Sequence, residues 1–474
     1  MALITHRRRQ YQVAGLVLGL CGLMWYFHGL RTHQPDFVHT HDKPVVADLD
    51  LPPTWDRLKK WEHDLPQHNT SLPFPEGKTG RYLFFKNEIQ MLGWNNCLNE
   101  RLMNSYLAYK TKRAYVFQNY IWKPEYYPWP REKFREQDPR TPLNALISGP
   151  TSGGPWDEGD MSPRSVSLDY YNEVCPESER RIINTGEIKP AIMWDDGKTI
   201  FSRWEKLLLD APERCIEIHP ADRAEDGFPQ VFDLYLWGSE RILNMWDEFS
   251  KSPISKLLGT SPVVNSAVDK NEYLFLPRGP RPAQRVSRNP YERMLAIHLR
   301  RGDYKEACKG LATWNSTFYS WNLLPNLPDK FIPPPGGSWG SNTPENEAKY
   351  MVHCLPTFDF IVNKIRDSRE EYVKAAPPGP GKVRMLDVLY LLTNDDSDWL
   401  DRLKDVLQKD GWHTVVTSRE LVLDQEEKDV GMAVDMDIAR RAAVFIGNGW
   451  SSFTSNILHR RLVDGKEWIS NRFY

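Results

Sequence analysis

The chain has 474 residues and a formal net charge of −2, with 40% hydrophobic and 26% charged side chains. This composition is that of a globular protein and excludes a disordered chain. The near-neutral charge excludes attraction to nucleic acid or to anionic lipid through an overall electrostatic field. A chain of this length exceeds one ordinary hydrophobic core, so we expect two lobes with accessory segments.

The N-terminus has the pattern of a membrane anchor. Three arginines at 7–9 precede the apolar run VAGLVLGLCGLMWYF, which spans residues 13–27. The basic flank predicts a cytosolic tail at 1–12, a transmembrane signal anchor at 13–30 and a lumenal C-terminus, as in a single-pass type II membrane protein. The alternative is a cleaved signal peptide, although no small-x-small cleavage site follows the run.

The segment after the anchor fits a lumenal address. Residues 31–76 are rich in Pro, His and Asp and lack periodicity, which predicts a stem that holds the folded part away from the membrane. Sequons at Asn69 and Asn315 predict N-glycosylation. We therefore expect a protein of the Golgi or endoplasmic reticulum membrane whose folded part is lumenal.

The cysteines bear on both the compartment and metal binding. Cys21 lies within the predicted anchor, and an odd number remain in the folded part: Cys97, Cys175, Cys215, Cys308 and Cys354. An oxidising lumen permits disulfides among them, and the odd number leaves at least one without a partner in the chain. No CxxC pair occurs, so neither a zinc site nor a redox motif is predicted.

The first lobe is predicted at 77–285. Residues 81–85 form an apolar strand, and a Gly-containing turn leads into a helix in which apolar residues recur at helical spacing, from Leu98 to Tyr109. Residues 114–117 then form a second strand. This strand–loop–helix–strand unit is the building block of a parallel α/β sheet.

The second lobe is predicted at 286–474. Its strands are expected at four apolar runs, which cover 294–299, 385–392, 413–417 and 442–448. Amphipathic helical patterns lie between them, so this half also has the alternation of an α/β sheet. The sequence therefore predicts two α/β lobes with a cleft between them.

Charged residues gather where the strand at 294–299 ends, in the stretch Ile297–Asp303. Ligands bind at this edge of parallel sheets. His298 and Arg300 point to one side of the strand, and an arginine offers a planar fork of donors that suits a diphosphate. The alternative is a strand-end salt bridge between Arg301 and Asp303.

Two further stretches pass from a strand through a glycine turn into a helix. In Gly447–Ile457, Ser451 and Ser452 open the helix, where backbone N–H groups and hydroxyls make an anion site. In Leu92–Cys97, asparagines stand at the helix start and can reach a ligand from the opposite lobe. Helix capping uses the same donors, so both interpretations remain open for each stretch.

These three stretches, in this order, resemble the protein O-fucosyltransferase family. The tail DMDIARRAAVFIGNGWSSFTSNI is similar to the C-terminal motif of the first type, which ends in FIGN-x-x-SSF. HLRRGDYKEAC resembles that type's His-Leu-Arg motif with the Asp-Trp-Lys-x-Ala-Cys that follows it, and the Gly93–Asn96 turn resembles its N-terminal Gly/Phe/Asn loop. The resemblance is close over about 290–310 and 430–460, moderate over 90–117, and slight through the middle of the chain.

The resemblance implies a GT-B fold with two Rossmann-like lobes, and an inverting, metal-independent fucosyltransferase that uses GDP-fucose and no further cofactor. Arg300 would grip the β-phosphate, and His298 would touch the ribose or a phosphate. Asp435 would bind guanine. Asn95 or Asn96 would reach the departing diphosphate and the sugar, with the register uncertain by one. The residues that would also contact the donor are Gly93, Trp94, Ser451, Ser452 and Phe453.

The family also implies covalent pairings. Cys308 stands where the family has a disulfide cysteine, so Cys308–Cys354 is the implied bridge, with Cys175–Cys215 as a second pairing. The implied partners are a GDP-sugar donor, a protein or glycan acceptor, and the membrane through the N-terminal helix, with no nucleic acid.

The sequence departs from the family in two places. The His-Leu-Arg motif reaches its Asp one residue earlier than the first type does. The second type carries a general-base Glu before its N-terminal Gly, where this chain has Gln90, Met91 and Leu92. Glu88 and Glu100 are near in sequence, but neither can be placed in the cleft, so the acceptor base is unassigned. The alternatives are a transferase for another GDP-sugar and a catalytically inactive lumenal binding or scaffold protein.

Overall fold

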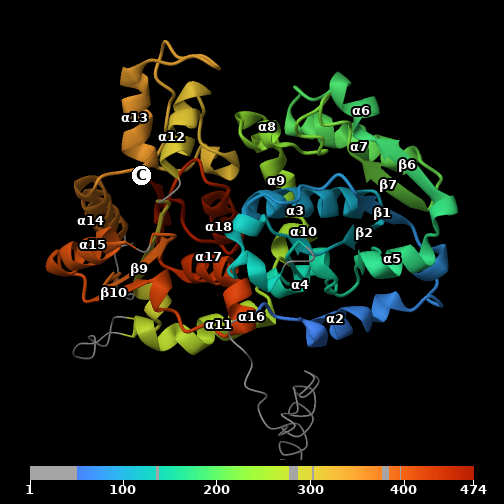
Figure 1. Cartoon of the computed structure of the whole chain (residues 1–474), viewed down its shortest axis with the longest axis horizontal. Helices are drawn as coiled ribbons and strands as arrows, with labels where there is room; N and C mark the ends of the chain where they lie inside the picture. Colours follow the sequence, from blue (N-terminus) through green and yellow to red (C-terminus); the bar gives the residue numbers. More distant parts are fainter. Residues whose placement is uncertain (1–50, 135–137, 277–286, 302–303, 376–383, 396) are drawn as a thin grey trace, which may run out of the picture. The chain divides into compact units, whose positions relative to one another are not determined.

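A computed structural model describes residues 51–134, 138–276, 287–301, 304–375, 384–395 and 397–474 (Figure 1). Residues 49–474 form one compact unit, which is described here by itself. The predicted tail, the anchor at 13–30 and residues 31–50 of the predicted stem lie outside the described residues. Within the described ranges, no helix combines the length and the apolar character that crossing a bilayer requires.

The first half of the chain builds a five-stranded parallel sheet in the order β5-β2-β1-β7-β6. Its central strand, β1, pairs with β2 at Tyr82↔Ala114 and with β7 at Tyr82↔Cys215. Residues along β1 and β2 are buried throughout, as expected of a parallel sheet covered on both faces. The strands are β1 (Tyr82–Phe85), β2 (Ala114–Phe117), β5 (Val166–Ser167), β6 (Arg180–Asn184) and β7 (Cys215–His219).

The second half builds another five-stranded parallel sheet, in the order β10-β9-β8-β11-β12. The chain runs from β8 outward through β9 to β10 and then returns to the other side of β8 with β11. The strand order therefore reverses between β8 and β11, and a crevice for a ligand opens at such a point. The strands are β8 (Met294–Leu299), β9 (Val388–Thr393), β10 (Thr414–Thr417), β11 (Val444–Gly447) and β12 (Asn471–Phe473). The prediction of two parallel α/β sheets is confirmed.

Helices cover the sheets (Figure 1), and the described residues also contain a short hairpin. The hairpin pairs β3 (Tyr120–Ile121) with β4 (Arg140–Thr141). The helices are α2 (Asp56–His63), α3 (Trp94–Lys110), α4 (Leu143–Leu146), α5 (Leu168–Val174), α6 (Thr185–Ile188), α7 (Gly197–Asp210), α8 (Leu234–Trp237), α9 (Trp246–Phe249), α10 (Pro253–Lys256), α11 (Pro262–Asn271), α12 (Tyr304–Thr313), α13 (Pro344–Cys354), α14 (Phe358–Lys374), α15 (Asp398–Lys409), α16 (Gln425–Asp429), α17 (Gly431–Arg441) and α18 (Ser452–Val463).

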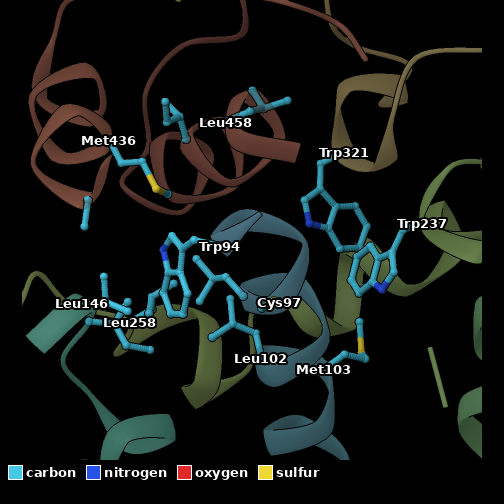
Figure 2. Close-up of a cluster of buried hydrophobic side chains, with 14 of the residues drawn as sticks. Trp94, Cys97, Leu102, Met103, Leu146, Trp237, Leu258, Trp321, Met436 and Leu458 are labelled. Atoms are coloured by element: carbon cyan, nitrogen blue, oxygen red, sulfur yellow. The ribbon is translucent and has the colours of Figure 1, made fainter. Parts of the chain in front are cut away.

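One hydrophobic core joins the two halves around α3. Nearly all of this helix is buried, because it packs on β2 on one side and on α18 on the other. Figure 2 shows Trp94 of α3 lying close to Leu146 and Leu258 of the first half, with Met436 of α17 and Leu458 of α18 beyond it. The start of α3 is therefore held in a fixed place relative to the second sheet.

The disulfides agree with the implied pairings. Cys308 of α12 bonds to Cys354 at the end of α13, and Cys175, after α5, bonds to Cys215 of β7. Cys97 is buried and unpaired among the described residues, which accounts for the odd number of cysteines.

Two segments differ from the predicted domain boundaries. Residues 51–76, expected in the stem, belong to the folded unit: the buried indole of Trp55 donates a hydrogen bond to Asp429, with a distance of 2.9 Å. Helix α11, expected in the first lobe, packs on α17 of the second half. Their tertiary contacts, which the local sequence does not specify, decide where both segments pack.

Candidate functional site

A cavity of about 900 Å³ lies where the carboxyl ends of the second sheet face the start of α3. Segments that are distant in sequence form its wall, and among them are the start of α3, the end of β8, α17, and the start of α18. The structure brings together every residue that was predicted to contact the donor: Gly93, Trp94, Asn95, Asn96, His298, Arg300, Asp435, Ser451, Ser452 and Phe453.

His298 and Arg300 lie at the end of β8. The His298 ring is buried, its Nδ1 lies 3.2 Å from the Thr454 hydroxyl, and its centroid lies 4.6 Å from that of Phe453. Burial, and then the charge of Arg300, lower the pKa of His298 to about 3, so the imidazole is neutral at physiological pH. The Arg300 guanidinium lies over the ring of Tyr304, 5.4 Å from its centroid. The strand end therefore presents a neutral ring and a cation to the cavity.

The start of α18 has the donors of an anion site. Ser451 occupies the N-cap position in extended conformation, but its side chain makes no capping hydrogen bond. The Ser451 hydroxyl therefore does not cap the helix. Together with the first N–H groups of α18, it can bind a ligand. The turn before it is tightly packed: a Cβ at Gly449 would lie 2.2 Å from the Phe318 ring.

Asp435 of α17 supplies a carboxylate on the same wall. The Tyr390 hydroxyl donates to its Oδ1, and the Ser418 hydroxyl donates to its Oδ2 over 2.9 Å. Burial raises the pKa of Asp435 to about 6, against the hydrogen bonds from these hydroxyls and the charge of Arg419, which lower it. The carboxylate is thus held in one orientation and is mostly ionised at pH 7.

The structure separates the two asparagines at the start of α3. Asn95 is buried, and both its carbonyl oxygen and its Oδ1 accept hydrogen bonds from Asn456 Nδ2, at 2.9 and 3.2 Å. Asn96 is half-buried, and its Oδ1 accepts from the Tyr319 hydroxyl at 3.3 Å. Both residues line the cavity, and Asn96 is the more exposed of the two. Gly93, the N-cap residue, brings no side chain to the helix start.

Neither Glu88 nor Glu100 reaches the cavity. Both are buried, Glu88 in the segment after β1 and Glu100 within α3. Glu88 accepts hydrogen bonds from Tyr115 and Gln118, and Glu100 accepts one from the Ile89 amide. Burial, and then the charge of Glu88, raise the pKa of Glu100 well above its usual range. Their hydrogen bonds give these carboxyl groups a structural role beneath the cavity.

The sequence did not single out several other residues on the cavity wall. Asp429 bonds to Trp55 and to Thr141, and burial raises its pKa to about 7. The segment after β10 contributes Ser418 and Arg419. Because ligands bind at the carboxyl ends of parallel strands, the sequence position of these residues could have pointed to them. Strand β3 and the segment that connects it to β4 add an aromatic wall of Tyr120, Trp122 and Tyr126.

Other predicted site residues lie elsewhere. Asn69 is exposed, and its Oδ1 accepts a hydrogen bond from the Ser71 amide, whereas Asn315 is half-buried with a φ of 49°. Their glycosylation stays a prediction. Within the described ranges, no group of three or more His, Cys, Asp or Glu side chains is arranged to hold a metal ion.

Comparison with known proteins gives only distant likenesses. No family model matches the chain, and no curated protein matches it in sequence. Among solved structures, apo POFUT1 is 16% identical with a TM-score of 0.43, over 81% of this chain and 96% of that one. POFUT1 with GDP-fucose is 14% identical with a TM-score of 0.41, over 80% and 94%. The fucosyltransferase NodZ from Bradyrhizobium is 12% identical with a TM-score of 0.38, over 81% and 92%. At these values the likeness assigns the chain to no family.

Proposed function

We propose that the chain is a glycosyltransferase of GT-B type that binds a GDP-sugar in this cavity and transfers fucose from GDP-fucose to a protein or glycan hydroxyl. The observation that carries the proposal is the convergence of Arg300, the start of α18 and Asp435 on one cavity. A guanidinium and helix N–H groups suit a pyrophosphate, and a fixed carboxylate suits the N1–H and amino group of guanine.

The proposed reaction is an inverting displacement. The acceptor oxygen forms a bond to the anomeric carbon as the bond from that carbon to the β-phosphate oxygen breaks, and the acceptor proton passes to solvent or to a base not yet assigned. Negative charge gathers on the diphosphate, where Arg300 and the N–H groups at Ser452 and Phe453 stabilise it. Because the leaving group is stabilised in this way, a strong base is less essential. We propose no metal ion for this step.

Ligand-dependent stabilisation tests the proposal directly. Thermal unfolding of the chain is measured with GDP, GDP-fucose, GDP-mannose and UDP, and release of GDP is followed with and without acceptors. We expect GDP and GDP-fucose to raise the midpoint, since a ligand at 100 times its Kd adds about 2.7 kcal/mol of stability, and UDP to leave it unchanged. Stabilisation by GDP without any turnover would favour the inactive scaffold alternative, and no response to GDP would overturn the proposal.

The affinity for GDP-fucose is expected to fall as the pH drops below about 6. Only the ionised Asp435, with a pKa of about 6, accepts from guanine, so affinity declines by up to about tenfold per pH unit. Folding raises the pKa of Asp435 from 3.8, so protonation of this carboxylate favours the folded state. The loss of GDP-fucose affinity at low pH therefore does not come from unfolding. Calorimetry from pH 5 to 7.5 checks this, and D435N should bind weakly with little pH dependence. GDP-fucose is the suitable ligand because its diphosphate diester gains no proton in this range.

We also propose a lumenal location, with the chain anchored through residues 13–30. The two disulfides support an oxidising compartment, because such bonds rarely persist in the cytosol.

A further inference from the structure

A tyrosine that follows α12 contacts the start of α3 from the opposite half of the molecule. Asn99 Nδ2 donates a hydrogen bond to the Tyr319 hydroxyl at 3.3 Å, and this hydroxyl donates to Asn96 Oδ1 at 3.3 Å. Tyr319 is also tied to the turn before α18, because its backbone N–H donates to the Gly449 carbonyl at 2.9 Å. One residue therefore joins the two helix starts that line the cavity.

The direction of this hydrogen-bond chain orients the Asn96 amide. A phenol has one proton to donate, and here it accepts from Asn99, so its own proton goes to Asn96 Oδ1. With Asn99 in this orientation, turning over the Asn96 amide would make Tyr319 face two N–H donors and leave its proton without an acceptor. Burial raises the pKa of Tyr319 above its ordinary value, so the phenol keeps its proton.

With Oδ1 engaged, the Asn96 Nδ2 is left on the cavity side. It lies 3.9 Å from where a Cβ of Gly93 would stand, and both residues line the cavity. Across the ranges that the structure describes, no protein group accepts from this Nδ2. The bonds from Asn456 to Asn95 fix the adjacent residue of the helix and so hold the backbone beneath it. The amide is thus preorganised as a donor toward an anionic group in the cavity.

We propose that Tyr319 is a positioning residue that fixes the Asn96 amide as a hydrogen-bond donor to the diphosphate or sugar oxygens of the bound donor substrate. The inference rests on the proposed function and adds to it a residue outside the cavity wall. Tyr319 is not among the residues that line the cavity, so its effect on transfer is expected to pass through Asn96.

A double-mutant cycle of Y319F, N96A and the pair tests this. Y319F keeps the ring and its packing and removes only the hydroxyl. A lost preorganised donor lowers the rate by roughly 100–1000-fold, so we expect N96A to lower kcat within that range and Y319F, which misorients the donor, by about tenfold. In the N96A background, Y319F is expected to change kcat by less than about twofold, since its target is already gone. KM for GDP-fucose should change little in each variant.

The controls separate positioning from packing and from failure of the proposed function. Y273F removes a hydroxyl from an exposed tyrosine and should match the unmodified chain. Equal effects of Y319F with and without Asn96, or a loss of kcat that only follows a lower unfolding midpoint, would overturn the inference while leaving the proposed function intact. If the unmodified chain binds GDP without turnover, the cycle is measured on the GDP Kd. N96A and Y319F should then weaken GDP binding, and Y319F should have no further effect in the N96A background. A chain that neither binds GDP nor transfers sugar would remove both proposals.

Discussion

Arg300→Ala is expected to lower transfer from GDP-fucose by about 100–1000-fold, with a fold that stays intact. The guanidinium follows β8 at the point where the strand order of the sheet reverses, and it lines the cavity opposite the start of α3. Charge on the departing diphosphate is greatest in the transition state, so the loss should appear mainly in kcat. Steady-state release of GDP, with circular dichroism for the fold, gives the measurement.

Two further variants make this result specific. Arg300→Lys keeps the charge but loses the planar fork, so its activity should lie between those of the alanine variant and the unmodified chain. Arg366→Ala removes an exposed arginine that pairs with Asp410 on the second half, and it should leave transfer unchanged. Full turnover by Arg300→Ala would show that the diphosphate is held elsewhere.

The sequence predicted those parts of the site that depend on local rules. Buried strands read as continuous apolar runs, and functional groups follow their carboxyl ends, so His298 and Arg300 could be found at the end of β8. The glycine turn after β11 led in the same way to Ser451 and Ser452. Each of these inferences needs only a few neighbouring residues and the direction of the chain.

The remaining parts depend on packing between distant segments. The sequence could not separate the two asparagines at the start of α3, because their burial depends on a distant partner. The contact with Asn456 holds Asn95 in a buried position, whereas Asn96 stays half-buried. Tyr319 and Trp55 act through partners far away in sequence, and neither stands in a periodic pattern. Glu88 and Glu100 have the carboxyl group that a general base needs, yet both are buried in hydrogen bonds away from the cavity.

Residues from both halves of the chain meet at the cavity, so a hydrophobic core shared by the two halves is needed to hold them in place. The anion donors come from one half and the Asn96 amide from the other, so their spacing depends on how α3 packs on α18. Trp94 begins α3 within that core, beside Met436 and Leu458 (Figure 2). Hydrogen-bond donors stabilise developing charge most when they need no rearrangement during the reaction, and a rigid core supplies that condition.

Removing the Cys308–Cys354 disulfide is expected to have the second large effect, on stability. The bridge closes a loop with a sequence separation of 46, and chain entropy for such a loop corresponds to about 4 kcal/mol at 25 °C. The bond ties α12 to α13, and α12 begins at Tyr304, on which the Arg300 guanidinium lies. The double variant C308S/C354S should therefore unfold at a markedly lower denaturant concentration and also bind GDP more weakly.

The second disulfide is the matched control. Cys175–Cys215 has a sequence separation of 40, so C175S/C215S should lose nearly the same stability, about 4 kcal/mol. This bridge joins the end of α5 to β7 in the first sheet and touches no residue of the cavity wall. Under conditions where both variants stay folded, GDP affinity should fall only when the Cys308 bridge is removed. The two variants lose the same stability, so a difference in GDP affinity must come from the position of the removed bridge. Equal GDP affinities would contradict the idea that α12 supports Arg300.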